Sequence, residues 1–166
     1  MKPNIQHYDT IIFDCDGVIL NSNKVKTGAF FETAKKYFGS KAAHQLVTYH
    51  INNGGISRYE KFEYLLKTIL GKEVNESDFS QLLSDFSSFV KERLLQSEIA
   101  AGLKQLKEKT PKAKWMVVSG GDQEELREVF SKRDLFKYFE GGIFGSPADK
   151  LEILKREFEN KNIAGE

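Results

Sequence analysis

Three short apolar segments each stop at small or acidic residues. They are Thr10-Ile11-Ile12-Phe13 before Asp14-Cys15-Asp16-Gly17, Trp115-Met116-Val117-Val118 before Ser119-Gly120-Gly121, and the weaker Ile143-Phe144 before Gly145-Ser146. Continuous apolar runs of this length predict strands buried on both faces, as in parallel sheets. Since ligands of α/β proteins bind where parallel strands end, we expect functional side chains at these three stops.

Residues with helical spacing fill the intervals between these segments. The first expected helix is outlined by Ile99, Leu103 and Leu106. The second is capped by Asp122 with Glu125 and continues through Leu126, Val129 and Phe130. The third begins at Ser146-Pro147 and carries the apolar stripe Leu151, Leu154 and Phe158. Ser as a cap and Pro at the first helical position favour that last start. The alternation of strands and helices predicts an α/β fold with a doubly wound, Rossmann-like parallel sheet.

Residues 22–97 carry a helical pattern only. Ser57 and Glu60 form a capping box, Gly71 closes the helix that follows, and Ser77 is expected to cap a further helix. We therefore expect an all-helical domain at residues 22–97. It is inserted into a discontinuous α/β core that comprises residues 1–21 and 98–166.

Composition excludes several classes of protein. The 166 residues include 25 Lys and Arg against 24 Asp and Glu, a net charge of +1, which gives no electrostatic argument for nucleic acid or an anionic membrane as a partner. No apolar run approaches the roughly 18 residues of a membrane span, and the N-terminus has no signal-peptide pattern. The single cysteine, Cys15, excludes an internal disulfide framework, and we expect a cytoplasmic protein.

Asp14 and Asp16 are the strongest chemical signal. Two carboxylates two residues apart at a strand end can face one site, where one acts as nucleophile and the other as general acid or base. Carboxylates also suit phosphoryl transfer, because they form acyl-phosphates and bind Mg²⁺, and Gly17 lets the backbone approach a phosphate closely. The alternative is a turn built from Asp and Gly. Cys15, between the two aspartates, is interpreted as a small core residue and not as a reactive thiol.

Three motifs in this order resemble those of the haloacid dehalogenase superfamily. Asp14-Cys15-Asp16-Gly17-Val18 is similar to the first motif, Val117-Val118-Ser119-Gly120-Gly121 to the second, and Lys150 to the third. The helical insert at 22–97 is similar in place and type to the cap of the phosphoglycolate phosphatase and β-phosphoglucomutase branch. The resemblance covers essentially the whole chain. It implies a Mg²⁺-dependent phosphatase that acts on a small phosphorylated metabolite, such as a sugar phosphate or phosphoglycolate.

The resemblance also implies a role for each matched residue. Asp14 would attack phosphorus, become the aspartyl-phosphate and bind Mg²⁺. Asp16 would protonate the leaving alcohol, activate water and bind the metal through its carbonyl. Ser119 and the Gly120 amide would hold phosphoryl oxygens, and Lys150 would neutralise charge in the transition state. Taken alone, Ser119 is interpreted as a strand-end cap and Lys150 as a solvated helix lysine.

The insert contains a polar, Gly-rich loop with two interpretations. Its sequence is His50-Ile51-Asn52-Asn53-Gly54-Gly55-Ile56-Ser57-Arg58. As the loop that closes over the substrate in this branch, it would use Arg58 for a second anionic group and Asn53 or His50 for hydroxyls. As a plain turn between helices, Asn-Gly-Gly would supply positive φ angles. Both interpretations stay open at this point.

The chain departs from the family after residue 159. The fourth motif, an apolar strand ending in Gly-Asp that supplies a further Mg²⁺ ligand, is missing, and the sequence reads Asn160-Lys161-Asn162-Ile163-Ala164-Gly165-Glu166 there. We therefore expect a core that is incomplete at its C-terminus, with weak phosphatase activity or none. Since that strand would lie beside Thr10–Phe13, we expect a second copy, a complementary fragment, a crystal neighbour or a rearranged segment to cover the bare edge.

Two other functions stay open on the sequence. A phosphomutase of the β-phosphoglucomutase type would use the same residues but protect the aspartyl-phosphate from water. A non-catalytic remnant would keep the helical insert and part of the core as an interaction module. Asp16 argues against dehalogenase chemistry, because true dehalogenases lack the second aspartate.

Overall fold

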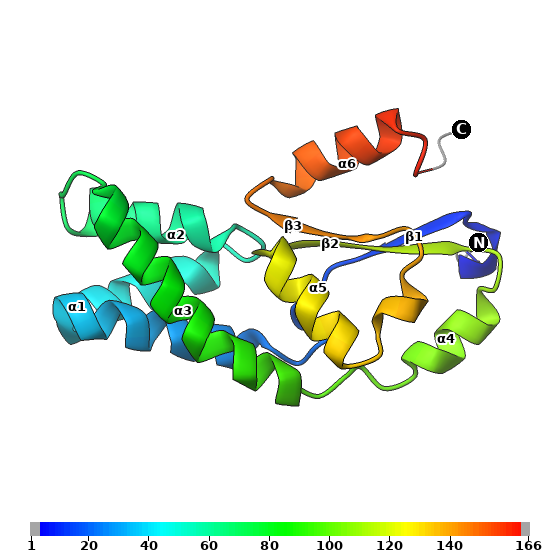
Figure 1. Cartoon of the computed structure of the whole chain (residues 1–166), viewed down its shortest axis with the longest axis horizontal. Helices are drawn as coiled ribbons and strands as arrows, with labels where there is room; N and C mark the ends of the chain where they lie inside the picture. Colours follow the sequence, from blue (N-terminus) through cyan, green and yellow to red (C-terminus); the bar gives the residue numbers. More distant parts are fainter. Residues whose placement is uncertain (1–3, 164–166) are drawn as a thin grey trace. The chain divides into compact units, whose positions relative to one another are not determined.

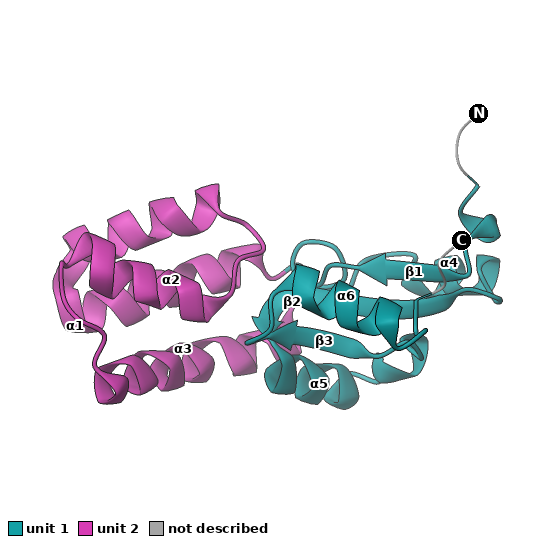
Figure 2. Ribbon diagram, turned by 90° about the horizontal axis from the view of Figure 1, so that it is seen from above, with its two compact units in different colours: residues 1–21, 98–166 teal, residues 22–97 magenta. Residues whose placement is uncertain are grey.

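The computed structural model describes residues 4–163. The chain divides into two compact units (Figure 2): unit 1 comprises residues 1–21 and 98–166, and unit 2 comprises residues 22–97. The boundaries fall where the sequence changes from alternating strands and helices to helices alone. Residues 164–166, which end the segment that replaces the fourth motif, lie outside the described part of the chain.

Unit 1 is built on a three-stranded parallel sheet in the order β1-β2-β3. Its strands are β1 (Thr10–Phe13), β2 (Lys114–Asp122) and β3 (Ile143–Ser146), and its helices are α4 (Leu103–Lys109), α5 (Gln123–Lys132) and α6 (Lys150–Glu159), with the short turns η1 (Ile5–His7) and η3 (Phe136–Tyr138). Figure 1 shows α6 on one face of this sheet and α4 with α5 on the other. The predicted parallel α/β fold with helices on both faces is confirmed.

Apolar side chains of alternating orientation make β2 the centre of unit 1. Trp115 packs on the face covered by α4 and α5, where its ring centroid lies 4.6 Å from that of Phe13. Met116 packs on the opposite face, in a buried cluster with Val118 and with Ile153 of α6. Each fully buried large apolar side chain contributes about 1.5–3 kcal/mol. This two-sided core therefore fixes β2 and, with it, the polar residues near its end.

β2 is longer than the sequence predicted. The prediction ended it at Val118, whereas the strand runs to Asp122. Asp122 still pairs with Ser146 of β3, after a register shift that begins at Val118. Gly145 permits this close approach, because a Cβ there would lie 2.2 Å from the carbonyl oxygen of Gly121. Small residues thus keep the two strands together beyond the regular ladder.

α6 begins at Lys150 and not, as predicted, at Pro147. Asp149 is its N-cap: the Asp149 carboxylate accepts from the Glu152 N–H, and the Glu152 carboxylate accepts from the Asp149 N–H. This capping box satisfies two N–H groups of the helix start. Ser146, which the prediction made the cap, instead ends β3.

Two of the three residues of the apolar stripe predicted on α6 do not face the core, whereas Leu154 packs against the buried cluster of Met116, Val118 and Ile153. Leu151 and Phe158 are 60% and 56% exposed, and Leu154 is half-buried. Ile153 is the apolar residue of α6 that is buried against the sheet. Because α6 packs over β2 and β3, Leu154 and Phe158 lie on the side of β1, near the exposed Ile12.

The chain leaves unit 1 after Asn21 and returns to it at Glu98. The Asn21 N–H donates to the Glu98 carbonyl at 2.9 Å, and the Asn21 side-chain amide donates to the Glu98 carboxylate at 3.2 Å. Leu20 and Ile99 form an antiparallel bridge beside them. Ile99 is therefore not part of the helix in which the sequence placed it, since α4 begins at Leu103.

Unit 2 is all-helical in its described elements, which are α1 (Asn23–Asn52), α2 (Arg58–Tyr64), the π-helical turn η2 (Leu65–Ile69) and α3 (Glu76–Gln96). Phe30, Phe62 and Phe86 form its aromatic centre, with ring centroids 4.4 to 5.6 Å apart. α1 is broken at Gly39, whose φ of 77° is left-handed. No helix within residues 4–163 is long and apolar enough to cross a membrane.

One predicted cap in unit 2 is confirmed and one is wrong. Ser57 caps α2 by accepting from the Glu60 N–H, as the capping-box spacing predicted. α3 is capped by Asn75 and not by Ser77, because the Asn75 side chain accepts from the Ser77 N–H at 2.8 Å. Asn and Ser are about equally good N-caps, so the residue types alone did not separate two candidates this close together.

Candidate functional site

Asp14 lies directly after β1, at the carboxyl edge of the sheet. The register pairs Phe13 of β1 with Val117 of β2, so Asp14 and Ser119 both follow within two residues of that pair. The Asp14 side chain is partly exposed, and its Oδ1 accepts from the Cys15 N–H at 2.7 Å. Cys15 itself is fully buried, as predicted for a small core residue. The strand therefore ends by presenting a carboxylate to solvent.

Lys150 reaches Asp14 across 136 positions of sequence. Its Nζ donates to Asp14 Oδ2 at 2.9 Å, and both side chains are partly exposed. The Asp149 cap sets where α6 begins and thereby places Lys150 at its first position. The structure thus brings together residues of the first and third predicted motifs. A positive charge lies beside the candidate nucleophile, where a phosphate would add negative charge.

Ser119 is fully buried in β2, at the same edge of the sheet. Its Oγ accepts from the Gly121 N–H at 3.0 Å. That contact uses the hydroxyl as an acceptor, so its own O–H can still donate to a ligand. Gly120 follows it in the strand and is half-buried. Holding of phosphoryl oxygens by Ser119 and Gly120 stays a prediction.

Asp16 and Gly17 lie in a tight turn after Asp14. Gly17 has a φ of 74°, and its N–H donates to the Leu20 carbonyl at 2.8 Å. Asp16 is half-buried and forms a backbone bridge with Leu20. The turn by itself requires a glycine at position 17. This agrees with the alternative interpretation of Asp14-Cys15-Asp16-Gly17 as a turn built from Asp and Gly. A contact between Gly17 and a substrate stays a prediction.

Asn53 and Arg58 belong to unit 2 and are described within it. Asn53 Nδ2 donates to the Tyr49 carbonyl at 2.9 Å, at the end of α1. Arg58 is 4% exposed: its guanidinium donates to Ser87 Oγ at 2.8 Å and lies 4.6 Å from the ring centroid of Phe86. These contacts orient both side chains. Substrate binding by either residue stays a prediction.

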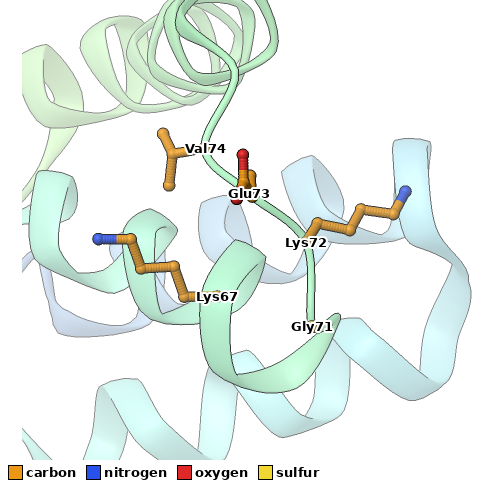
Figure 3. A pocket seen from close by; sticks show the side chains of 5 residues that line it. All are labelled: Lys67, Gly71, Lys72, Glu73 and Val74. Carbon is orange, nitrogen blue, oxygen red and sulfur yellow. The ribbon is translucent and has the colours of Figure 1, made fainter.

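Unit 2 also contains a cavity of about 530 Å³ (Figure 3), lined by Lys67, Gly71, Lys72, Glu73 and Val74. Figure 3 shows the side chains of Lys67 and Lys72 pointing in opposite directions. Lys67 pairs with Glu63, and Lys72 Nζ lies 5.3 Å from the ring centroid of Phe38. The two ammonium groups therefore do not converge on a ligand position, and this cavity has no arrangement for binding an anion.

Asp149 is the residue of this site that the sequence prediction missed. The spacing of Asp149 and Glu152 is a capping-box signal and was available in the sequence. The Ser146-Pro147 pair gave a competing signal that was followed instead. In the structure the Ser146 hydroxyl is buried, and it has no hydrogen-bond partner among the described residues.

Comparison with known proteins agrees with this geometry. The family model of haloacid dehalogenase-like hydrolases matches residues 8–163. The chain therefore belongs to the haloacid dehalogenase-like hydrolase family. No curated protein matches the sequence.

Several solved structures share the fold. A predicted phosphoglycolate phosphatase from Haemophilus somnus 129pt is 16% identical, with a TM-score of 0.64 over 94% of this chain and 74% of that one. A predicted phosphatase from Clostridium acetobutylicum is 17% identical, with a TM-score of 0.68 over 94% and 71%. A protein assigned to the β-phosphoglucomutases from Thermotoga maritima is 20% identical, with a TM-score of 0.56 over 94% and 72%. At these identities the likeness shows the fold alone.

The oxygen ligands at the end of β1 fit the Mg²⁺ that the family implies. Asp14 offers carboxylate oxygens and Asp16 a carbonyl oxygen, and both are the hard donors that this ion prefers. Mg²⁺ is commonly held by one or two carboxylates together with substrate phosphate and water. Within residues 4–163 no group of three or more His, Cys, Asp or Glu gathers to hold a metal. The donor set fits the ion but supplies few charged ligands.

Proposed function

We propose that this hydrolase is a Mg²⁺-dependent phosphatase that cleaves a small phosphorylated metabolite through an aspartyl-phosphate on Asp14. The observation that carries the proposal is the hydrogen bond of 2.9 Å between Lys150 Nζ and Asp14 Oδ2 at the carboxyl edge of the sheet. A carboxylate nucleophile and a fixed cation are the two groups that phosphoryl transfer needs most. Because Cys15 is the single cysteine of the sequence, we further propose that the protein works in the reducing cytoplasm.

In the proposed reaction, Asp14 attacks phosphorus and the bond to the leaving alcohol breaks. Asp16 gives its proton to the leaving oxygen, so the alcohol departs neutral. Water then attacks the phosphorus of the aspartyl-phosphate and returns a proton to Asp16, which releases phosphate and frees Asp14. Lys150 offsets charge on the phosphoryl group, and Ser119 with the Gly120 amide holds its oxygens, while Gly17 allows close approach.

Mg²⁺, when bound by Asp14 and Asp16, would supply charge neutralisation for the phosphate. With two aspartates as the protein ligands, we expect weak binding of the ion and slow turnover. In unit 2 we propose Arg58 as a ligand for a second anionic group of the substrate and Asn53 as a ligand for a hydroxyl, which would favour a sugar phosphate or a phosphorylated acid.

Hydrolysis of p-nitrophenyl phosphate with Mg²⁺ tests the proposal. We expect slow release of p-nitrophenol that Asp14→Asn abolishes and that the control Asp78→Asn, at an exposed carboxylate of α3, leaves unchanged. Turnover that survives in Asp14→Asn would contradict the nucleophile assignment.

Two other outcomes would select the alternative functions. Isomerisation of a sugar phosphate without release of phosphate would indicate a phosphomutase. If wild-type protein neither turns over nor binds the phosphate analogue beryllium fluoride with Mg²⁺, the chain is a non-catalytic module.

A further inference from the structure

The last turn of α1 contains a histidine whose two ring nitrogens each lie against a hydrogen-bonding group. His50 Nδ1 lies 3.0 Å from Lys61 Nζ of α2, and His50 Nε2 lies 3.2 Å from Thr27 Oγ1 of α1. Lys61 is 3% exposed and His50 is half-buried. Water therefore screens this contact between the two helices only in part.

The contacts of His50 determine where its proton lies. An ammonium group has three donors and no acceptor, so His50 Nδ1 accepts the hydrogen bond from a charged Lys61. A neutral lysine beside an imidazolium is much less favourable, because the ordinary pKa values of lysine and histidine are about 10.4 and about 6.5. The Thr27 hydroxyl donates to the Asn23 carbonyl at 2.9 Å, so its oxygen can accept from His50 Nε2–H. His50 is therefore neutral, with its proton on Nε2.

Among the charged side chains of α2, Lys61 is the one that the structure places against this imidazole ring. Arg58 instead donates to a serine hydroxyl of α3, and the acids Glu60 and Glu63 bond to the N-cap serine and to a lysine one turn on. Phe30 of α1, itself packed on an aromatic ring of α3, lies 4.7 Å from the imidazole between ring centroids. The ring is thus held between an ammonium group and an apolar side chain.

We propose that His50 is a pH-sensitive switch that holds α2 to the end of α1 when neutral and releases it when protonated. Protonation places a second positive charge and a second N–H donor against Lys61. The unfolded chain takes up this proton at about pH 6.5, whereas the folded contact opposes it. Because the unfolded state binds more protons below that pH, the stabilisation is fully present above about pH 6.5 and is lost as the pH falls further.

The switch would act on the residues of unit 2 that we propose as substrate ligands. α2 begins at Arg58, and Asn53 is the C-cap of α1. Release of α2 from α1 in acid would therefore disturb both side chains. This consequence rests on the proposed function, whereas the switch itself is tested without substrate.

Ring nitrogen-15 NMR of the intact wild-type chain tests the proton positions. His50 should carry its proton on Nε2 at about pH 7.5 and should stay neutral at about pH 6, where about three quarters of an ordinary histidine is charged. His44 of the same helix is the matched control: its Nδ1 donates to the Ser40 carbonyl at 2.7 Å, so Nε2 can take a proton without loss of that contact. A charged His50 at about pH 6, or a proton on its Nδ1 at about pH 7.5, would overturn the proposal.

Urea denaturation followed by circular dichroism tests the effect on stability. From about pH 7.5 to about pH 5.5, the unfolding equilibrium constant of wild type should rise by up to about tenfold more than that of His50→Asn, which keeps an oxygen acceptor for Lys61 but does not titrate. His44→Asn should keep the wild-type pH dependence. The same pH dependence in wild type and His50→Asn would contradict the switch, and the NMR test on wild type decides the matter if that variant does not fold.

Discussion

At the scale of single residues, the contact between Asp14 and Lys150 is the feature from which the proposed chemistry follows. The two residues lie 136 positions apart and meet at 2.9 Å. The sequence supplied both through the resemblance of its motifs. The contact itself depends on where α6 begins, which the sequence prediction placed at Pro147 instead of Lys150.

Replacing Lys150 should slow catalysis far more than it changes stability. Lys150→Ala removes a fixed positive charge beside the phosphoryl group, and we expect the rate of p-nitrophenyl phosphate turnover to fall by about 10²–10³-fold. Lys104→Ala, at an exposed lysine of α4, is the control and should keep the wild-type rate. Equal rates for the two variants would show that Lys150 is only a surface lysine.

Ser119 should contribute to both stability and catalysis. In Ser119→Ala the Gly121 N–H loses its acceptor in a buried position, so we expect a loss of about 1–3 kcal/mol in the free energy of unfolding. Ser88→Ala removes an exposed hydroxyl that donates to the Ser84 carbonyl, and should change stability by less than about 0.5 kcal/mol. Urea denaturation of both variants measures the difference, and a similar small loss in each would contradict the buried contact.

At the scale of elements, the cap of α6 connects stability to the site. Asp149→Ala removes the capping box and should cost about 1 kcal/mol, with slower turnover, because Lys150 is the first residue of the helix. Asn75→Ala removes the cap of α3 and should cost a similar amount without slowing turnover. Denaturation and kinetics of both variants separate the two effects. Unchanged turnover in Asp149→Ala would show that the cap does not position Lys150.

Unit 2 should become less stable in acid, because a contact between α1 and α3 depends on the charged carboxylate of Asp85. Hydrogen bonds from Lys36 and Tyr37 hold the pKa of Asp85 below its ordinary value of 3.8. Because the folded-state pKa is the lower one, this stabilisation is fully present above pH 3.8 and is lost as the pH falls through the folded-state pKa.

Asp85→Asn tests this pH dependence. The variant should be less stable than wild type near neutral pH by about 0.2–1 kcal/mol. The difference should shrink as the pH falls below 3.8. Thermal denaturation across this range measures it, and a constant difference at every pH would contradict the assigned cause.

Elements were predictable where local pattern and tertiary packing agree. The apolar runs at β1 and β2 predicted parallel strands, and Ser57 predicted the start of α2. The expected burial on both faces is confirmed for β2 but is wrong for β1, which is only partly buried and leaves Ile12 exposed. The orientation of α6 was not predictable, because its apolar stripe favours burial of Leu151 and Phe158 whereas the sheet buries Ile153. The end of β2 was missed because glycine and serine usually mark loops, while Gly145 here lets the strands stay close.

At the scale of the whole molecule, the chain combines a sheet-based unit and a helical unit, and the family match covers residues 8–163. The candidate site belongs to unit 1, where the sheet has three described strands, and the contact of His50 with Lys61 belongs to unit 2. The order of the three motifs along the sequence predicted where the candidate site lies. The contact of His50 with Lys61 depends on how α1 and α2 pack, and only the structure identifies it.

The most direct test of the proposed function is to trap the phosphorylated residue. Wild-type protein is mixed with p-nitrophenyl phosphate or acetyl phosphate and Mg²⁺, quenched in acid and reduced with borohydride, which converts an aspartyl-phosphate to homoserine. Peptide mass spectrometry should locate homoserine at position 14, and Lys150→Ala should lower its yield. Turnover without modification at Asp14, or modification of another residue, would contradict the assignment of Asp14 as the nucleophile.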